Sequence, residues 1–171
     1  MSGRVSKGSN PIVSPRSTIR NLFLYLGAGL ISGLILGFTL KMIQSLSGHR
    51  VYRLLLNTDY VPLLNRFVLG ELIEFGIHLL ISAVLVLILG WIWQRRSIKH
   101  PPSAISMAAV TAVVGLVIGI LLYPTTLLSA GGTPPIDSLP AWLWWLSAHL
   151  LYGAVSGLLL YAILHFQAKR F

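Results

Sequence analysis

The sequence has no cysteine and few acidic residues. Among its 171 residues there is no Cys, and Asp and Glu together number four. The absence of thiols excludes disulfide bonds, thiolate metal sites and cysteine nucleophiles. The sequence also has no P-loop, no dinucleotide fingerprint and no nucleophile with a base and an orienting acid. The motifs by which many enzymes are recognised are therefore missing.

Charged side chains are too scarce to cover a soluble domain of this length. Only 10% of the residues are charged, whereas 55% are hydrophobic. A hydrocarbon core of about 30 Å is crossed by roughly 20 helical residues. Four apolar runs reach that length, at residues 22–43, 71–93, 104–123 and 142–165. The sequence predicts an all-α polytopic membrane protein whose four transmembrane helices occupy residues 22–165.

Basic residues beside the predicted spans indicate their orientation. Residues 1–21 are basic and rich in Ser, Gly and Pro, so we expect a disordered cytoplasmic arm. Arg95 and Arg96 in the second connection, and the basic tail at residues 166–171, place both termini in the cytoplasm by the positive-inside rule. The net charge of +9 lies in short segments rather than in a basic domain. It predicts contact with the lipid bilayer and no nucleic-acid partner.

The first connection, residues 45–70, departs from this charge pattern. It carries three Arg residues against one acid, Asp59, and its VYRLLLN and VPLLNRFVLG pieces are amphiphilic. We expect an external loop that lies in the membrane interface, where Arg side chains reach the headgroups. A re-entrant segment is the alternative.

Two segments of the chain resemble each other. HLLISAVLVLIL, starting at His78, and HLLYGAVSGLLL, starting at His149, are identical at seven of twelve positions. Similar glycine motifs, GLILG and GLVIG, occur in the spans that precede them. The pattern indicates two helical hairpins, residues 22–93 and 104–165, related as a parallel internal repeat. Convergent membrane composition is the alternative explanation.

Small residues recur four positions apart on two of the predicted spans. This spacing lets helix backbones approach closely, which favours helix association in lipid. The motif predicts a packing face, either within the chain or between two copies of it. The residues are Gly29, Gly33, Gly37, Gly115 and Gly119.

Ionisable groups interrupt the second and fourth spans. Glu71, Glu74 and His78 share one helical face, and His149 should reach a similar depth in the fourth span. Placing such groups in a membrane costs free energy unless they face the bundle interior or water. They therefore form a candidate polar site. Four roles stay open: a structural tie in which Glu74 pairs with His78, a proton or solute pathway, a metal site, or axial ligation of haem. No catalytic residue is assigned, and the metal and cofactor remain unknown, since neither HExxH nor paired ExxH motifs occur.

Several short motifs resemble those of a known family. They are LLNRFVLGEL before the second span, the IHLLIS core, the YP ending of the third span with its TPP loop, and HLLYG. From the first span onward the chain resembles the YqhR-like group of small bacterial membrane proteins, and more distantly YagU. The distant relative has an acidic residue before its final His, where this chain has Ser147 and Ala148. The resemblance implies a bacterial plasma-membrane location and supplies no substrate.

Three functions are compatible with these observations. The first is a non-enzymatic helical bundle that acts as a subunit or stress-related membrane factor, with a second copy or another membrane protein as partner. The second is a proton-coupled transporter or channel that uses Glu74, His78 and His149. The third is a metal-dependent membrane enzyme.

Overall fold

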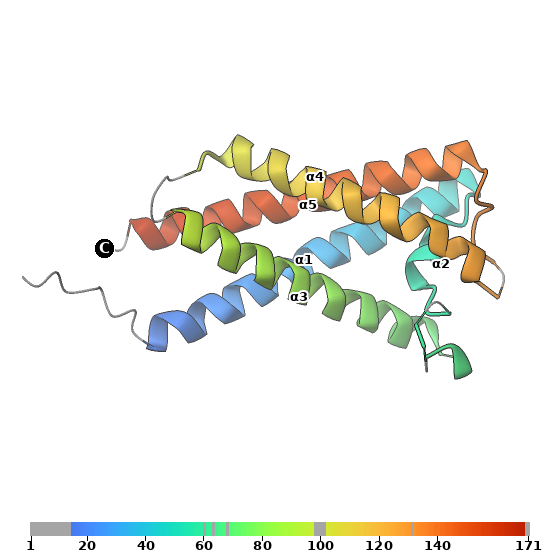
Figure 1. The fold of residues 1–171 in the computed structure, drawn as a ribbon, viewed down its shortest axis with the longest axis horizontal. Coiled ribbons are helices and arrows are strands. Elements are labelled where there is room, and N and C mark those ends of the chain that lie inside the picture. Colours follow the sequence, from blue (N-terminus) through green and yellow to red (C-terminus); the bar gives the residue numbers. More distant parts are fainter. Residues whose placement is uncertain are drawn as a thin grey trace, which may run out of the picture.

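The computed structural model describes residues 15–59, 61–62, 64–67, 69–97, 102–130 and 132–169, which contain helices and no β-strand. Four long helices run along the molecule (Figure 1): α1 (Pro15–Ser47), α3 (Glu71–Ser97), α4 (Ala104–Leu122) and α5 (Leu139–Ala168). Three short helices join them: α2 (Val51–Leu56), η1 (Leu64–Arg66) and η2 (Tyr123–Leu128). Each of these helices is long and apolar enough to cross a membrane, with α4 and η2 counted together as one span. The predicted all-α architecture with four spans is confirmed.

Two of the predicted helices are too short. α1 begins at Pro15, so residues 15–21 belong to the helix and not to the predicted arm, while residues 1–14 lie outside the described ranges. α5 likewise extends to Ala168, into the predicted tail. Apolar runs mark only the part of a helix within the hydrocarbon layer, and these helices continue beyond it.

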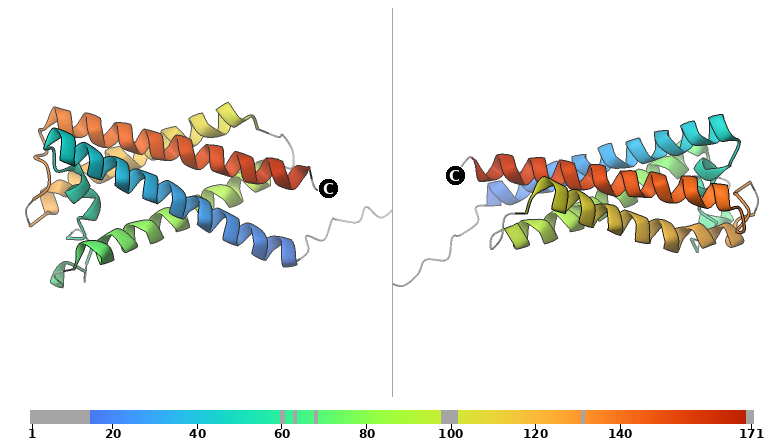
Figure 2. Two further views of the ribbon diagram at one scale, coloured as in Figure 1. Left: turned by 180° about the vertical axis from the view of Figure 1, so that it is seen from behind. Right: turned by 90° about the horizontal axis from the view of Figure 1, so that it is seen from above.

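The long helices pack as two hairpins. The most extensive contacts join α4 to α5 and α1 to α3, and contacts between α1 and α5 hold the hairpins together. α3 has few contacts with the second hairpin. Both hairpins start at the end of the bundle where α1 begins and α5 ends (Figures 1 and 2), hereafter the terminal end. The opposite end, where α1 and α4 end and α3 and α5 begin, is hereafter the loop end.

Equivalent glycines make equivalent contacts in the two hairpins. A Cβ added to Gly33 would lie 2.9 Å from the Cβ of Ser82, and one added to Gly115 would lie 3.2 Å from the backbone nitrogen of Gly153. Aligning the two His-Leu-Leu segments makes Ser82 and Gly153 equivalent, as the glycine motifs do for Gly33 and Gly115. The hairpins therefore share one packing register, which supports a parallel repeat.

The other glycines of the predicted packing face also lie at helix crossings. Gly29 faces the backbone of Ala83, Gly37 faces the ring of Phe75, and Gly119 lies against His149. All these contacts are within the chain, between α1 and α3 or between α4 and α5. Of the two arrangements left open by the motif, packing inside the chain is the one that the structure contains.

The segment after α1 folds back onto the bundle. Val51, Leu54 and Leu56 of α2 are at most 2% exposed. The apolar side chains of VYRLLLN are thus buried against the long helices and not against lipid, while the depth of this piece in the membrane interface stays a prediction. An amphiphilic segment can place its apolar face against lipid or against other helices. Here that face lies against the helical bundle. α2 covers the loop end of the structure.

Candidate functional site

A small cavity, hereafter the histidine cavity, lies inside the loop half of the bundle. Its volume is about 230 Å³, and its polar lining includes His78 and Ser82 from α3 and His149 and Tyr152 from α5. α2 contributes Leu54 and Leu55, which cover the cavity toward the loop end. Further lining residues are Leu36, Ile81, Leu85, Ile118, Leu122 and Trp145. The two histidines of the predicted site therefore share one cavity, although they belong to different hairpins.

The orientation of His149 is fixed by its own helix. Its Nδ1 lies 2.9 Å from the carbonyl oxygen of Trp145, and its ring centroid lies 4.2 Å from that of the Trp145 indole. A carbonyl oxygen can only accept, so Nδ1 carries the proton and donates it. In the neutral ring the other nitrogen, Nε2, is then an acceptor. The side chain is 2% exposed. His149 thus presents a fixed acceptor in an apolar setting.

His78 has an unused nitrogen. Its Nε2 and the Oγ of Ser32 are the two buried side-chain atoms without a hydrogen-bond partner in the described part of the chain. The imidazole stacks on Phe75, with 6.4 Å between ring centroids. Leaving a buried polar nitrogen unpaired costs about 1–3 kcal/mol. A ligand that bonds this nitrogen would recover part of that cost.

The three hydroxyl groups of the cavity are already engaged, and that of Thr125 donates to the carbonyl of Leu122 over 2.7 Å. Ser82 Oγ donates to the carbonyl of Gly29 over 2.7 Å, and it lies 3.0 Å from the hydroxyl of Tyr152. Because Ser82 has one proton, Tyr152 is the donor in the second bond. This chain of bonds ties α1, α3 and α5 together. The unused hydrogen-bonding capacity of the cavity therefore belongs mainly to its imidazoles.

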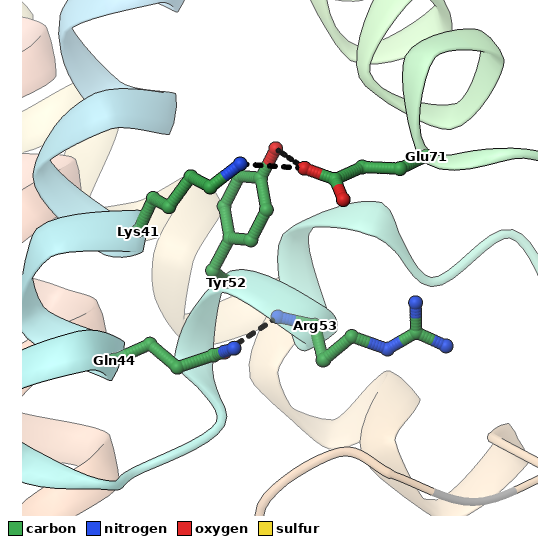
Figure 3. A network of polar contacts seen from close by, with 5 residues as sticks. All are labelled: Lys41, Gln44, Tyr52, Arg53 and Glu71. Carbon is green, nitrogen blue, oxygen red and sulfur yellow. Dashed lines mark hydrogen bonds and ion pairs between the residues drawn. The ribbon is translucent and has the colours of Figure 1, made fainter.

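Glu71 belongs to a separate network at the loop end. Its Oε1 lies 2.7 Å from Lys41 Nζ and accepts a hydrogen bond of 3.1 Å from the Tyr52 hydroxyl (Figure 3). Nearby, the backbone N–H of Arg53 donates to Gln44 Oε1 over 3.1 Å. Both interactions attach α2 to the long helices. Glu71 does not line the histidine cavity.

Glu74 does not join His78 in the predicted pair. The two side chains are not hydrogen bonded, and Glu74 is absent from the cavity lining. The i, i+4 spacing permits a contact, but the His78 ring stacks on Phe75 and lines the bundle interior. Glu74 is half-buried at the start of α3. The predicted set therefore divides into two cavity histidines and two carboxylates outside the cavity.

The predicted residues do not assemble into a recognisable metal centre. Within the described ranges, no three His, Cys, Asp or Glu side chains are grouped so that they could hold a metal ion. Structural zinc sites use four protein ligands and catalytic ones use three. The metal-enzyme alternative gains no support from the described residues.

The prediction missed Tyr152 as a cavity residue. It lies on the same face as His149, three positions later, and its hydroxyl completes the link to Ser82. The aligned repeats contain a signal, because HLLY replaces HLLI and puts a phenol where the first copy has Ile81.

Comparison with known proteins gives no relatives: no protein-family model, curated protein or solved structure matches the chain significantly. The resemblance to the YqhR-like group stays a prediction that depends on short motifs.

Proposed function

We propose that this protein is a non-enzymatic integral protein of the bacterial plasma membrane that binds a small amphiphile in the histidine cavity. The observation that carries the proposal is a pair of imidazoles, one on each hairpin, that line the same cavity, together with the buried Nε2 of His78, which has no partner among the described residues. A purely structural histidine would be expected to bond a neighbouring side chain or the backbone through this atom. A subunit or stress-related role is compatible with such binding.

The lining limits the chemistry of the ligand. Most of the wall is aliphatic, so the body of the ligand is apolar. His149 Nε2 accepts, so the ligand carries at least one donor, such as a hydroxyl. The cavity volume of about 230 Å³ is below the roughly 300–1,000 Å³ of pockets that enclose drug-sized ligands. A small alcohol, or the hydroxyl end of a longer lipid-like molecule, fits these limits.

The route of entry follows from the packing of the helices. The cavity has walls on α3 and α4, which belong to different hairpins, and Ile81 on its α3 wall is 51% exposed. In a bilayer this exposed surface meets lipid. The loop end is covered by α2. We infer that the ligand enters sideways from the bilayer and not from water.

The proton-coupled alternative is less well supported by the geometry. A proton path from the loop end would need polar groups within hydrogen-bond reach of one another, but Glu74 and His78 are not bonded. The cavity lining between them and α4 is mainly aliphatic. Binding uses the features that are present and requires no continuous polar path.

The orientation of the protein is part of the proposal. At the loop end, four cations balance all four acids of the chain: Lys41, Arg50, Arg53 and Arg66 against Asp59, Glu71, Glu74 and Asp137. The other nine Lys and Arg residues lie in sequence segments 1–20, 95–99 and 169–170. This asymmetry supports a cytoplasmic terminal end, and hence a histidine cavity in the outer half of the membrane. The resemblance to the YqhR-like group supports the bacterial location.

Photolabelling tests the proposed site. The probe is an octanol that carries a diazirine, applied to the purified protein in lipid nanodiscs, and mass spectrometry maps the adducts. We expect adducts on residues that line the histidine cavity, and we expect excess octanol to suppress them. Ile118→Phe should fill the cavity and abolish the labelling. Ile120→Phe is the matched control, because Ile120 is on the same helix but is 45% exposed and does not line the cavity. Adducts confined to lipid-facing positions, or labelling that Ile118→Phe leaves intact, would reject the site.

A further inference from the structure

A second concave site lies between α1 and α5 at the terminal end. This groove has a volume of about 580 Å³ and is walled by Phe23, Ile31, Leu159 and Phe166. Arg20 and Gln167 also line it, near the first turns of α1 and the last turns of α5. The amide of Gln167 donates to Asn21 Oδ1 over 2.8 Å and so links the two helices there. The groove is thus apolar along the helices, with a cation and an amide toward the chain termini.

A glycine keeps the groove open. A Cβ added to Gly27 would meet no atom within 4 Å. A Cβ added to Gly29, in contrast, would meet the backbone of Ala83. Gly27 therefore has no role in helix packing of the kind that Gly29 has. It lines the groove, and any larger side chain there would extend into the space.

The terminal end has cations but no acids to pair with them. All four Asp and Glu residues belong to the loop end, and the ion pair found among the described residues, Lys41 with Glu71, does not involve Arg20. Arg95, Arg96 and Lys169 add positive charge at the same end. An anionic group in the membrane would supply the missing counter-charge. Such attraction is worth about 1 kcal/mol per Lys or Arg near an anionic lipid surface, or roughly fivefold in affinity.

We propose that the groove between α1 and α5 holds one anionic phospholipid, with an acyl chain along the apolar wall and the phosphate at Arg20. The chemistry of both ends fits this ligand, since the aliphatic and aromatic wall suits an acyl chain and a guanidinium binds phosphate oxygens in bidentate fashion. The position of the groove on the membrane-spanning surface gives such a lipid direct access. The site is separate from the histidine cavity and does not depend on its proposed function.

Native mass spectrometry tests this site with two lipids of matched acyl chains. The detergent-purified full chain is supplied with phosphatidylglycerol or with phosphatidylcholine, and the retained lipid is counted on the protein. We expect one retained phosphatidylglycerol and about fivefold less phosphatidylcholine. Arg20→Gln should remove that preference. Gly27→Leu should reduce the retention of both lipids without lowering the melting temperature, because the new side chain meets open space.

Gly76→Leu is the matched control for the groove-filling variant. Gly76 lies on α3, its added Cβ also meets nothing within 4 Å, and it does not line the groove. The control should retain lipid like the unmodified chain. Equal retention of the two lipids by the unmodified chain would overturn the proposal. So would unchanged retention in Gly27→Leu, or a dimer that Gly27→Leu dissociates, since a second copy would then occupy the groove.

Discussion

His78 on α3 and His149 on α5 line one cavity: His78 Nε2 has no hydrogen-bond partner among the described residues, and the bond from His149 Nδ1 to the Trp145 carbonyl leaves His149 Nε2 as an acceptor. A hydroxyl group can donate to one imidazole and accept from another. The same ligand atom could therefore engage both hairpins. This relationship is the reason we propose a binding site at the two histidines, and it separates them from the carboxylates that share the face of His78 in the sequence.

Removing either cavity histidine should weaken the binding of the octanol probe. A hydrogen bond contributes on the order of 1 kcal/mol, so His149→Ala or His78→Ala should each lower the affinity roughly fivefold. Because one hydroxyl bridges both nitrogens, the double variant should lose less than the sum of the two single losses. His165→Ala, at the exposed terminal end of α5, should have no effect. Additive losses would show that the histidines bind independently or act only through packing.

The variant Glu74→Gln separates binding from proton transfer. Glu74 lies outside the cavity and is not bonded to His78, so the substitution should change the free energy of unfolding by no more than about 0.5 kcal/mol. Photolabelling by the octanol probe should also be unchanged. A proton pathway through Glu74 requires its carboxylate. Abolition of a measured pH-dependent flux by Glu74→Gln would therefore favour the transporter alternative.

Gly33 should not tolerate a larger side chain. A Cβ there would lie 2.9 Å from both Cβ and Oγ of Ser82, whose hydroxyl also bonds Gly29. Gly33→Leu should destabilise the fold by about 1–3 kcal/mol or more, since the two helices must separate. Thermal unfolding in detergent measures the loss, with Gly76→Leu as the control. Equal melting temperatures for the two variants would contradict the packing of α1 against α3.

High pH should loosen the attachment of α2. Burial, followed by the hydrogen bond to Glu71 and the charges of Glu71 and Glu74, raises the pKa of Tyr52 from 10.0 to about 12. A raised pKa in the folded state means a stabilisation that is complete below the unfolded value of 10 and is lost as the pH rises toward 12. Melting temperatures should therefore fall more steeply over this range in the unmodified chain than in Tyr52→Phe. Parallel curves for the two proteins would contradict the assigned environment.

Labelling of single cysteines tests the orientation, and the native chain offers no background thiol. Ser97→Cys follows Arg95 and Arg96, and Thr133→Cys lies in the loop between η2 and α5. A membrane-impermeant thiol reagent added to intact cells should label residue 133 and not residue 97. The reverse pattern would turn the histidine cavity toward the cytoplasm.

The sequence predicted the features that depend on local pattern. Apolar runs predicted the four spans, and the starts of α3 at Glu71 and of α4 at Ala104 agree with the structure. The glycine spacing predicted close helix contacts because the space it leaves is a property of one helix face. The shared histidine in HLLISAVLVLIL and HLLYGAVSGLLL pointed to His78 and His149 as one site, and both line the histidine cavity.

Features that depend on partners distant in the chain could not be predicted in this way. Glu71 shares a helical face with His78, but it pairs with Lys41, thirty residues earlier in the sequence, and with Tyr52. α2 is amphiphilic, and only the packed bundle shows that its leucines are buried by protein. Periodicity identifies which side chains share a face, whereas the partner of that face is set by tertiary packing.

The most direct test of the account is the ¹⁵N resonance of His149 Nε2, measured on histidine-labelled protein in nanodiscs. Addition of octanol should shift this resonance in the direction that a new hydrogen bond to the unprotonated nitrogen produces. Methyl octyl ether, which has a similar chain and no donor, should leave it in place. If octanol does not shift the resonance, or if the ether shifts it equally, His149 offers no acceptor to a ligand and the cavity does not have the proposed function.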